Sequence, residues 1–581
     1  MTWWKEAVFY QIYPRSFNDT DGDGVGDIRG ITEKVDYIDS LGIDAVWLNP
    51  VYESPQVDYG YDVSDYRAVH DEYGTMEDWE NLLEKLHDRD IRLVMDLVAN
   101  HTSDEHAWFV KSRESEDGYE DYYVWREGRE REEGAEDGTE DDEENKGEED
   151  EAERIPPNNW ESAFGGSAWK YDEGRDEFYL HLFHDKQPDL NWRNSDVREE
   201  IADMVEWWLK KGVDGFRMDV VNLLSKPDDF PDGDPESGWV GYEHFANGPR
   251  IHEYLGELYE RAFVPHDAVT IGEMPEVTSD EAERYANDGI NIVIPFEHME
   301  LDSGDTVDWY TTEVELVELK QVFSSWQEAD CWTSLYWNNH DQPRAVSRFG
   351  DDEEYRVESA KMLATLSFTL KGTPFVYQGE EVGMTNAEFE SFDEIRDTGT
   401  LRRAKLAMEE IGIKGFENVR DIVNYWTRDN ARTPMQWSDD EGAGFTEAGV
   451  EPWLKINPNH GRINVKEARE DENSILGYYR DLIELRKQNP VLVYGDYELL
   501  LDDHSDVYVY ERSSEDDEDK ESDRVLVTAN FFDGEPSFSL PKSYDGELGE
   551  VMISNYEDSG ETDTGGEFEL RPYEARVYRV V

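Results

Sequence analysis

Residues 215–220, with the sequence Gly-Phe-Arg-Met-Asp-Val, decide the predicted fold because they read as a short buried strand that ends in a carboxylate. A helical pattern over residues 201–209 and a turn signal at 211–214 precede them. Residues two apart in a strand point to the same face, so Arg217 and Asp219 are expected side by side. A neighbouring guanidinium favours an ionised carboxylate, which is a candidate nucleophile. An ordinary structural ion pair explains this hexapeptide equally well.

Outside this stretch, short apolar strands alternate with helical patterns. Such an alternation is typical of a parallel sheet, and eight units close a (β/α)₈ barrel whose active site lies at the carboxyl ends of the strands. Polar residues gather at those predicted ends, which favours a functional role for Asp219: Asn100, His101, Arg217, Glu273, His340 and Asp341. The other strands are predicted near residues 6–14, 45–50, 91–101, 270–273, 291–295, 335–341 and 373–380, with helices near 31–41, 76–88 and 251–262.

The chain divides into three predicted parts. The barrel occupies residues 1–101 and 172–498, an inserted subdomain follows the third strand at 102–171, and residues 499–581 form an antiparallel β-sandwich. Between residues 127 and 154 there are 16 acidic and 4 basic residues without apolar periodicity. This composition predicts a solvated insertion, with an anionic docking segment as the alternative.

The net charge of −84 excludes nucleic acid and anionic membranes as expected partners, since such a surface repels both. Acidic chains poor in aromatics tend to be disordered, but aromatic residues make up 13% of this one. It contains 20 Lys against 35 Arg. We expect a protein from a halophile, in which molar salt screens self-repulsion within about 3 Å. An acidic partner-binding surface is the alternative.

Sequence features that bear on cellular location predict a cytoplasmic protein. No apolar run is long enough to span a membrane, and the N-terminus lacks the charged-then-apolar plan of a signal peptide. The one cysteine, Cys331, cannot form an internal disulfide, which fits a reducing compartment. We expect a monomer or weak homo-oligomer that acts on a small molecule.

Alternate carboxylates separated by glycines follow the first predicted strand. A tight, oxygen-rich loop of this kind suits Ca²⁺. The pattern resembles the first part of an EF-hand loop but lacks the glutamate at its twelfth position. A polar surface turn is the alternative. The predicted metal-binding positions are Asp19, Asp21, Asp23, Val25 and Asp27.

Four segments at predicted strand ends resemble the signature segments of the α-amylase superfamily, glycoside hydrolase family 13. They are residues 96–101 (DLVANH), 215–219 (GFRMD), 272–273 (GE) and 339–341 (NHD). Three further stretches resemble the oligo-1,6-glucosidase and α-glucosidase branch of that family: residues 187–191, 372–381 and 429–437. The resemblance extends from residue 4 into the C-terminal sandwich.

The resemblance implies a retaining glycosidase with two carboxyl groups roughly 5–5.5 Å apart. Asp219, kept ionised by Arg217, matches the nucleophile. Glu273, with an expected raised pKa, matches the general acid and base. Asp341 matches the family's third carboxylate, which binds sugar hydroxyls in relatives.

The resemblance also implies a pocket for a terminal glucose. Asp58 would bind its hydroxyls and pair with Arg432, while Tyr61 would stack on the sugar face. Val220 follows the nucleophile, and valine there accompanies cleavage of α-1,6 links in relatives. The metal loop would be structural. The remaining expected substrate contacts are His101, Phe164, Arg217 and His340.

These expectations describe a retaining, exo-acting α-glucosidase that releases glucose from short oligosaccharides, with α-1,6 bonds favoured and α-1,4 bonds possible. A covalent intermediate can also be captured by a sugar, so a transglucosylase or a sugar isomerase of the trehalose synthase or sucrose isomerase type is the alternative within the family. A non-catalytic homologue, like the heavy chains of amino-acid transporters, is the alternative from another class. Those chains lack the catalytic carboxylates and carry a membrane anchor, whereas Asp219, Glu273 and Asp341 are all present here.

Overall fold

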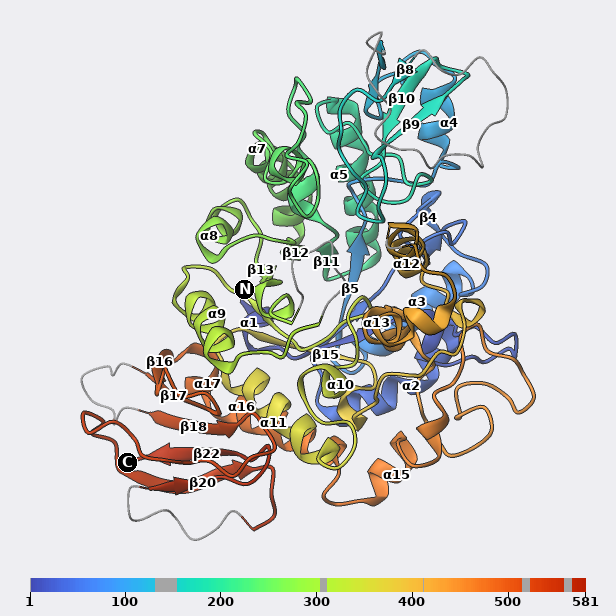
Figure 1. The fold of residues 1–581 in the computed structure, drawn as a ribbon. Coiled ribbons are helices and arrows are strands. Elements are labelled where there is room, and N and C mark those ends of the chain that lie inside the picture. Colours follow the sequence, from blue (N-terminus) through green and yellow to red (C-terminus); the bar gives the residue numbers. More distant parts are fainter. Residues whose placement is uncertain (1, 131–153, 303–310, 411, 515–522, 559–566) are drawn as a thin grey trace.

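Eight parallel strands form the centre of the molecule in the computed structural model, which describes residues 2–130, 154–302, 311–410, 412–514, 523–558 and 567–581 (Figure 1). The strands lie side by side in chain order. They are β1 (Phe9–Ile12), β2 (Ala45–Leu48), β5 (Arg92–Leu97), β11 (Gly215–Met218), β12 (Val269–Glu273), β13 (Ile292–Ile294), β14 (Ser334–Leu335) and β15 (Thr373–Tyr377).

The sheet closes on itself. Strand β1 pairs with β2 on one side and with the last strand, β15, on the other, so that Phe9 lies opposite both Ala45 and Phe375. A parallel bridge between Val293 and Thr333 joins β13 to the chain just before β14. The predicted (β/α)₈ barrel is therefore confirmed. Because successive side chains of a strand point to opposite faces, Phe9 packs in one apolar cluster and its neighbour Tyr10 in another.

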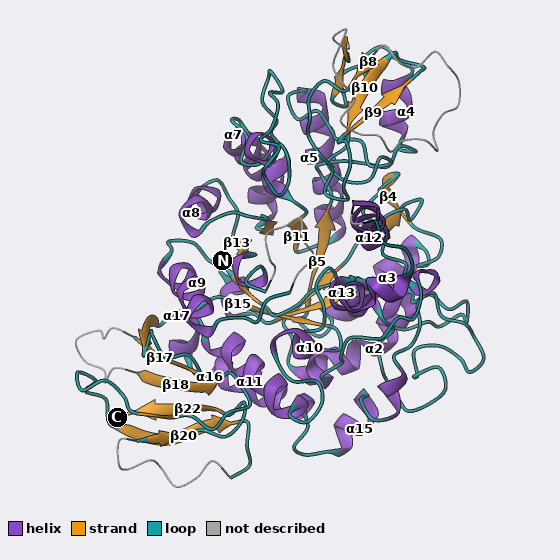
Figure 2. Cartoon of the chain, in the orientation of Figure 1, coloured by secondary structure: helices purple, strands orange, loops and turns teal. Residues whose placement is uncertain are grey.

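Long helices connect the strands and surround the barrel (Figure 2). Their ends follow local capping chemistry: the Asn194 side chain caps the start of α5, and Gly212 ends it with a φ of 114°. After α7 the chain continues through a π-helical turn at Tyr259–Phe263. The helices are α2 (Ile28–Leu41), α3 (Met76–His87), α5 (Ser195–Lys211), α7 (Ile251–Leu258), α8 (Ser279–Asn287), α9 (Leu316–Glu328), α11 (Arg356–Thr369) and α16 (Ile475–Gln488).

An insertion between β5 and α5 forms a separate three-stranded sheet, at the upper right of Figure 1. It contains β6 (Trp125–Arg126), β9 (Trp169–Asp172) and β10 (Glu177–Leu180), and is accompanied by α4 (Ala107–Arg113) and the pair β7 (Arg129–Glu130) and β8 (Arg154–Ile155). Because β9 pairs with β10, this sheet crosses residue 171, the boundary expected from the sequence. Most of the acidic stretch 127–154 lies outside the described residues.

Two helices after β15, α12 (Thr398–Glu410) and α13 (Arg420–Trp426), were not predicted from the sequence. The Arg403 guanidinium of α12 donates to the carbonyl of Ala163 in the insertion, 3.0 Å away. The Tyr59 hydroxyl donates to the Arg396 carbonyl just before α12, at 3.1 Å. This segment therefore contacts both the insertion and the loop after β2, at the carboxyl end of the barrel.

The C-terminal part is an antiparallel sheet in the order β16-β17-β18-β22-β20, with a separate pair β19–β21. The buried Arg512 of β17 joins it to the barrel by donating to the Thr369 carbonyl at the end of α11, where Arg486 of α16 donates to the adjoining carbonyls of Phe368 and Leu370. The strands are β16 (Asp496–Leu500), β17 (Val507–Ser513), β18 (Arg524–Asn530), β19 (Ser537–Phe538), β20 (Leu548–Ser554), β21 (Phe568–Glu569) and β22 (Ala575–Val580).

The remaining α-helices and strands are short and lie in the connections. They are α1 (Trp3–Glu6), β3 (Tyr52–Glu53), β4 (Asp65–Val69), α6 (Tyr242–Phe245), α10 (Ala345–Phe349), α14 (Asp429–Arg432), α15 (Val465–Glu470) and α17 (Pro490–Tyr494). Among the described residues, no helix combines the length and the apolar character needed to cross a membrane.

Candidate active site

A single guanidinium organises the carboxylates at the ends of three neighbouring strands. Arg217 of β11 is fully buried, and its Nη1 lies 2.8 Å from the Asp96 carboxylate and 2.6 Å from that of Asp219. Its Nη2 contacts the carboxylate of Glu273, the last residue of β12. Strand register explains the arrangement, because Arg217 lies opposite Asp96 on one side and Ile271, two residues before Glu273, on the other.

Burial sets the protonation of this cluster. It raises the pKa of Asp219 to about 6 even though Arg217 opposes the shift. It raises the pKa of Glu273 to about 7, again against Arg217 and with the Asp219 charge adding to the rise. The sequence predicted that Arg217 keeps Asp219 ionised. In the structure the effect of desolvation is larger than that of Arg217, so the pKa of Asp219 lies above its ordinary value. Both carboxyl groups are thus shifted toward holding a proton.

The backbone at Val220 supports the same pair. Val220 has a φ of 36°, a left-handed conformation that is rare for a β-branched residue. Its main-chain N–H donates to Glu273 Oε2 at 3.2 Å. Its side chain packs in an apolar cluster with residues of the insertion, including Trp160 and Phe178. Backbone strain of this kind concentrates at functional sites, where the surrounding structure holds it in place.

Asp341 lies among cationic and imidazole groups. Its carboxylate is 2.5 Å from Arg432 Nη2, 3.3 Å from Arg428 Nη1 and 3.0 Å from His340 Nε2. Burial opposes its ionisation, but these neighbours hold the pKa of Asp341 well below its ordinary value. The Gln11 amide nitrogen lies 2.9 Å from His340 Nδ1, so Nδ1 accepts and the ring proton is on Nε2, the nitrogen that faces Asp341.

Asp58 is held by a different arginine from the predicted one. Arg428 Nη2 lies 3.1 Å from the Asp58 carboxylate, whereas Arg432 is engaged by Asp341 and by the carbonyl of His340. The expected Asp58–Arg432 pair is therefore wrong in this structure. Arg428 immediately precedes the 429–437 motif and was not identified from the sequence.

The other predicted pocket residues connect to these groups. The Tyr61 ring stacks on the His340 ring with centroids 5.3 Å apart. The Gln187 amide nitrogen contacts Asp58, the Tyr61 carbonyl and His101 Nε2 at 3.2–3.3 Å. The Arg428 guanidinium lies over the Phe164 ring, 5.4 Å from its centroid. The structure thus brings the predicted pocket residues into one network at the carboxyl end of the barrel. Sequence reasoning missed Asp96, Gln187 and Arg428 as members, although Asp96 and Gln187 lie within the recognised motifs.

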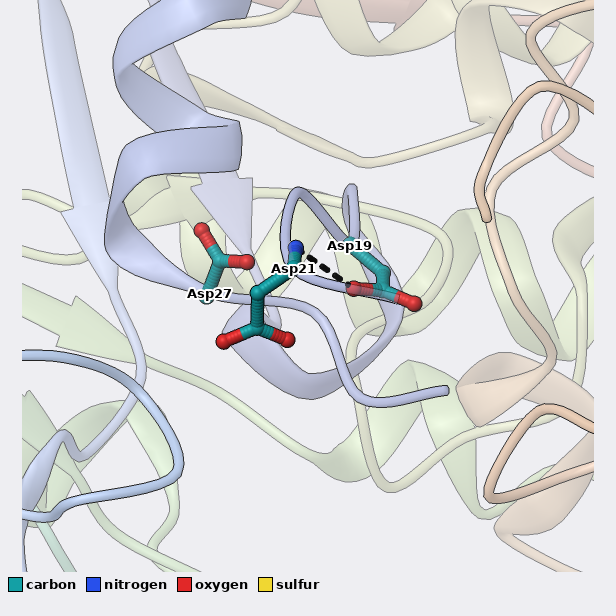
Figure 3. Close-up of side chains that lie close together, drawn as sticks. All are labelled: Asp19, Asp21 and Asp27. Atoms are coloured by element: carbon teal, nitrogen blue, oxygen red, sulfur yellow. Dashed lines mark hydrogen bonds between the residues drawn. The ribbon is translucent and has the colours of Figure 1, made fainter. Parts of the chain in front are cut away.

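The predicted metal loop gathers three of its carboxylates. One oxygen from each of Asp19, Asp21 and Asp27 lies within 4.8 Å of the others (Figure 3). Asp23 is not part of this group, and its carboxylate accepts from the Val25 N–H at 2.8 Å. Asp27 also caps α2, accepting from the Gly30 N–H. Hard oxygen donors at this spacing fit the ligand preference of Ca²⁺.

Comparisons with known proteins agree with this geometry. The family model described as alpha amylase, catalytic domain, matches residues 11–495. The chain is 51% identical to an oligo-1,6-glucosidase of Parageobacillus thermoglucosidasius, over 100% of this chain and 99% of that one.

Two solved structures superpose over its full length. A trehalose-6-phosphate hydrolase of Bacillus licheniformis has a TM-score of 0.90 at 42% identity, covering 100% of both chains. An isomaltulose synthase from Klebsiella sp. LX3 has a TM-score of 0.90 at 40% identity, covering 100% of this chain and 99% of that one. With a barrel of this topology and matches that cover nearly all of its length, the chain belongs to the α-amylase family, glycoside hydrolase family 13.

Proposed function

We propose that this protein is a retaining, exo-acting α-glucosidase that hydrolyses terminal α-1,6 bonds of short oligosaccharides and releases glucose. The Arg217 cluster is the observation that carries the proposal, since it places two buried carboxyl groups, both with raised pKa values, around one cation. The oligo-1,6-glucosidase relative at 51% identity supports the choice of linkage.

The proposed reaction has two steps at the anomeric carbon. Asp219, in its ionised form, attacks that carbon while Glu273 gives its proton to the leaving glycosidic oxygen. Glu273 then removes a proton from water, which displaces Asp219 and releases glucose with its original configuration. The raised pKa of Glu273 lets it hold the proton required in the first step. Arg217 compensates the negative charge that collects on Asp219 when the glucose leaves.

The pocket residues suit a single terminal sugar. Asp58 and Arg428 form one ion pair and Asp341 and Arg432 another, and these charged groups can exchange hydrogen bonds with the hydroxyls of a glucose. Tyr61 adds an aromatic ring beside them. Polar groups around an aromatic surface are typical of sites that orient a sugar. The two ion pairs would close the end of the pocket and restrict cleavage to chain ends.

Val220 is the residue on which the linkage preference rests. A branched apolar side chain beside the nucleophile limits how the leaving sugar can lie, and an α-1,6 link has an extra rotatable bond with which to swing that sugar aside. About 1.4 kcal/mol of differential transition-state binding gives a tenfold preference in kcat/KM.

Rates on isomaltose and maltose test this proposal. We expect isomaltose to be cleaved at least as well as maltose, and the Val220→Thr variant to shift the kcat/KM ratio toward maltose while remaining folded. Good hydrolysis of maltose with negligible hydrolysis of isomaltose would contradict the linkage, while the family would stand.

A sugar isomerase is the second candidate, supported by the full-length similarity to an isomaltulose synthase. Product analysis separates the two: a hydrolase converts sucrose, if it accepts it, into glucose and fructose, whereas an isomerase returns a disaccharide.

We also propose that residues 19–27 hold a structural Ca²⁺. The support is the group formed by Asp19, Asp21 and Asp27, with Asp23 as a neighbouring carboxylate outside it. The ion would supply the positive charge that offsets repulsion among these carboxylates.

For the cellular setting, we propose the cytoplasm of a salt-accumulating organism. The −84 net charge and the low lysine content support this proposal, as does the free thiol of Cys331. An assembly no larger than a weak homo-oligomer fits the self-repulsion of such a surface.

A further inference from the structure

Arg348 of α10 is a buried cation that the proposed chemistry does not use. Its Nε and Nη2 lie 2.7 Å and 2.5 Å from the two carboxylate oxygens of Asp302, forming a bidentate pair. The side chains of both residues are almost fully excluded from solvent, at 0% and 1% exposure. Its Nη2 also donates to the carbonyl of Met299. This pair therefore fixes the loop that follows β13 against the loop that follows β14.

The same guanidinium reaches the residue next to Asp341. Arg348 Nη1 donates to Gln342 Oε1 at 2.5 Å, and Gln342 directly follows Asp341 in the chain. The main chain is constrained there as well, because the Gln342 N–H donates to the carbonyl of Asn339 and the Asp341 N–H to the side chain of Asn339.

Helix α13, which ends two residues before Arg428, also contacts the Arg348–Asp302 pair. The Tyr425 hydroxyl of α13 donates to Asp302 Oδ2 at 2.7 Å. The Arg348 guanidinium lies over the ring of Trp426, 4.9 Å from its centroid. Arg428, which binds both Asp58 and Asp341, follows two residues later. Arg348 therefore contacts Gln342, which follows Asp341, and Trp426, which lies two residues before Arg428.

We propose that Arg348 is a positioning residue of the sugar pocket, acting through Gln342 on Asp341 and through Trp426 on Arg428. This inference rests on the proposed function, in which those two residues surround the terminal glucose. The planar fork of arginine makes the bidentate contact, the contact to Gln342 and the contact to the Trp426 ring at the same time, which the single ammonium of lysine cannot do. Small displacements of positioned groups lower reaction rates by large factors. Loss of this geometry should therefore have a larger effect on kcat/KM than on the stability of the fold.

The Arg348→Lys variant tests the proposal. We expect its kcat/KM on isomaltose to fall at least tenfold when measured well below its melting temperature. The Arg512→Lys variant is a matched control, because Arg512 is also a buried arginine with several hydrogen bonds but lies at the junction with the C-terminal sheet. It should lower the melting temperature and leave kcat/KM unchanged.

A double-mutant cycle with Gln342→Ala separates positioning from a general effect on packing. If Arg348 acts through Gln342, the loss in the double variant should be smaller than the product of the two single losses. In the control cycle, the variant that combines Gln342→Ala with Arg512→Lys should lose kcat/KM by the product of the two single factors. If Arg348→Lys does not fold, Tyr425→Phe removes one hydrogen bond from the same group and should lower kcat/KM by a smaller factor.

An unchanged kcat/KM in folded Arg348→Lys and Tyr425→Phe, or independent losses for Arg348 and Gln342, would overturn the inference. These outcomes can be told apart from failure of the proposed function, because that failure appears in the unmodified enzyme as a lack of isomaltose hydrolysis. If the unmodified enzyme cleaves maltose instead, the same cycle measured on maltose tests the inference.

Discussion

At the scale of single residues, one guanidinium serves three carboxylates, and this sharing sets the conditions under which the site can work. Arg217 cannot neutralise Asp96, Asp219 and Glu273 together, and burial raises the pKa of all three above their ordinary values. Each of these shifts favours a proton held within the cluster. That proton is the one which the proposed mechanism delivers to the leaving group.

We predict a narrow bell-shaped pH profile for kcat/KM. The rate should rise with an apparent pKa of about 6 as Asp219 ionises, and fall above an apparent pKa of about 7 as Glu273 loses its proton. Initial rates on isomaltose between pH 4 and pH 9, at fixed salt, provide the measurement. The Glu273→Gln variant serves as the control, since its residual activity should lack the alkaline limb. A flat profile across this range would show that these two groups do not govern the rate.

We predict that substitutions of Glu273 and Asp219 have different effects on kcat and on the covalent intermediate. Glu273→Gln should lower kcat by about 10²–10⁴-fold, the usual contribution of a general acid. Asp219→Asn should lower it by several orders of magnitude and abolish the covalent glucosyl adduct seen by mass spectrometry, because an amide is a poor nucleophile. Circular dichroism and melting temperature check that each variant is folded. Near-normal turnover by Asp219→Asn would remove it from the nucleophile position.

Motif residues could be located from the sequence because each lies at the end of a strand, and strand ends converge in a parallel barrel. The pairing of charges could not be predicted in the same way. Arg428 and Arg432 lie one helical turn apart around α14, so either could reach Asp58, and only the packed side chains decide between them. The left-handed backbone at Val220 has no sequence signal either, since valine rarely adopts it.

At the scale of elements, the start of α2 depends on the same residue as the proposed metal loop. Asp27 accepts from the Gly30 N–H at the first turn of α2 and belongs to the carboxylate group with Asp19 and Asp21. The loop is also connected to a distant part of the chain, because the Thr446 hydroxyl donates to Asp19 at 2.6 Å. A bound ion would therefore stabilise both a helix and a long-range contact.

We predict that chelation of divalent metal lowers the melting temperature, because a ligand bound only by the native state stabilises it by mass action. The effect on kcat should be smaller at temperatures where the protein stays folded, since no residue of the loop belongs to the Arg217 cluster. Calorimetry with a chelator, followed by readdition of Ca²⁺, provides the measurement, and Asp21→Asn gives a variant with a weakened site. Elemental analysis that finds no divalent metal in purified protein would contradict the site.

Several helices were not predicted from the sequence, for different reasons. Helix α11 is buried from Ser359 to Thr369, so it has no alternation of apolar and polar faces to reveal a helical period. In α12, Ala404 is fully buried while Leu406 is 42% exposed, so its apolar residues show no clear helical period. The barrel strands are short but fully buried, which makes their apolar runs visible in the sequence. Even β13, with three residues, was placed near its true position because Ile292–Ile294 is entirely apolar.

At the scale of the whole molecule, the net charge of −84 acts against folding in dilute buffer. We predict that both the melting temperature and the activity rise as KCl or NaCl increases from dilute to molar concentration. The Debye length falls from roughly 30 Å at 0.01 M to about 3 Å at 1 M salt, which removes most repulsion between surface carboxylates. Thermal melts and isomaltose rates over this range provide the test. A melting temperature that is flat or falls with salt would refute the proposed halophilic origin.

The pairing of the first strand with the last one has a consequence for synthesis on the ribosome. Strand β1 emerges early, yet one of its two partners, β15, lies more than 360 residues further along the chain. At translation rates of about 5–20 residues per second, β1 waits for on the order of 20–70 s with one edge unpaired. An unpaired apolar edge invites association with other chains. The nascent protein should therefore depend on chaperones during this interval, and a circular permutant that begins between β14 and β15 would move the waiting edge from β1 to β15.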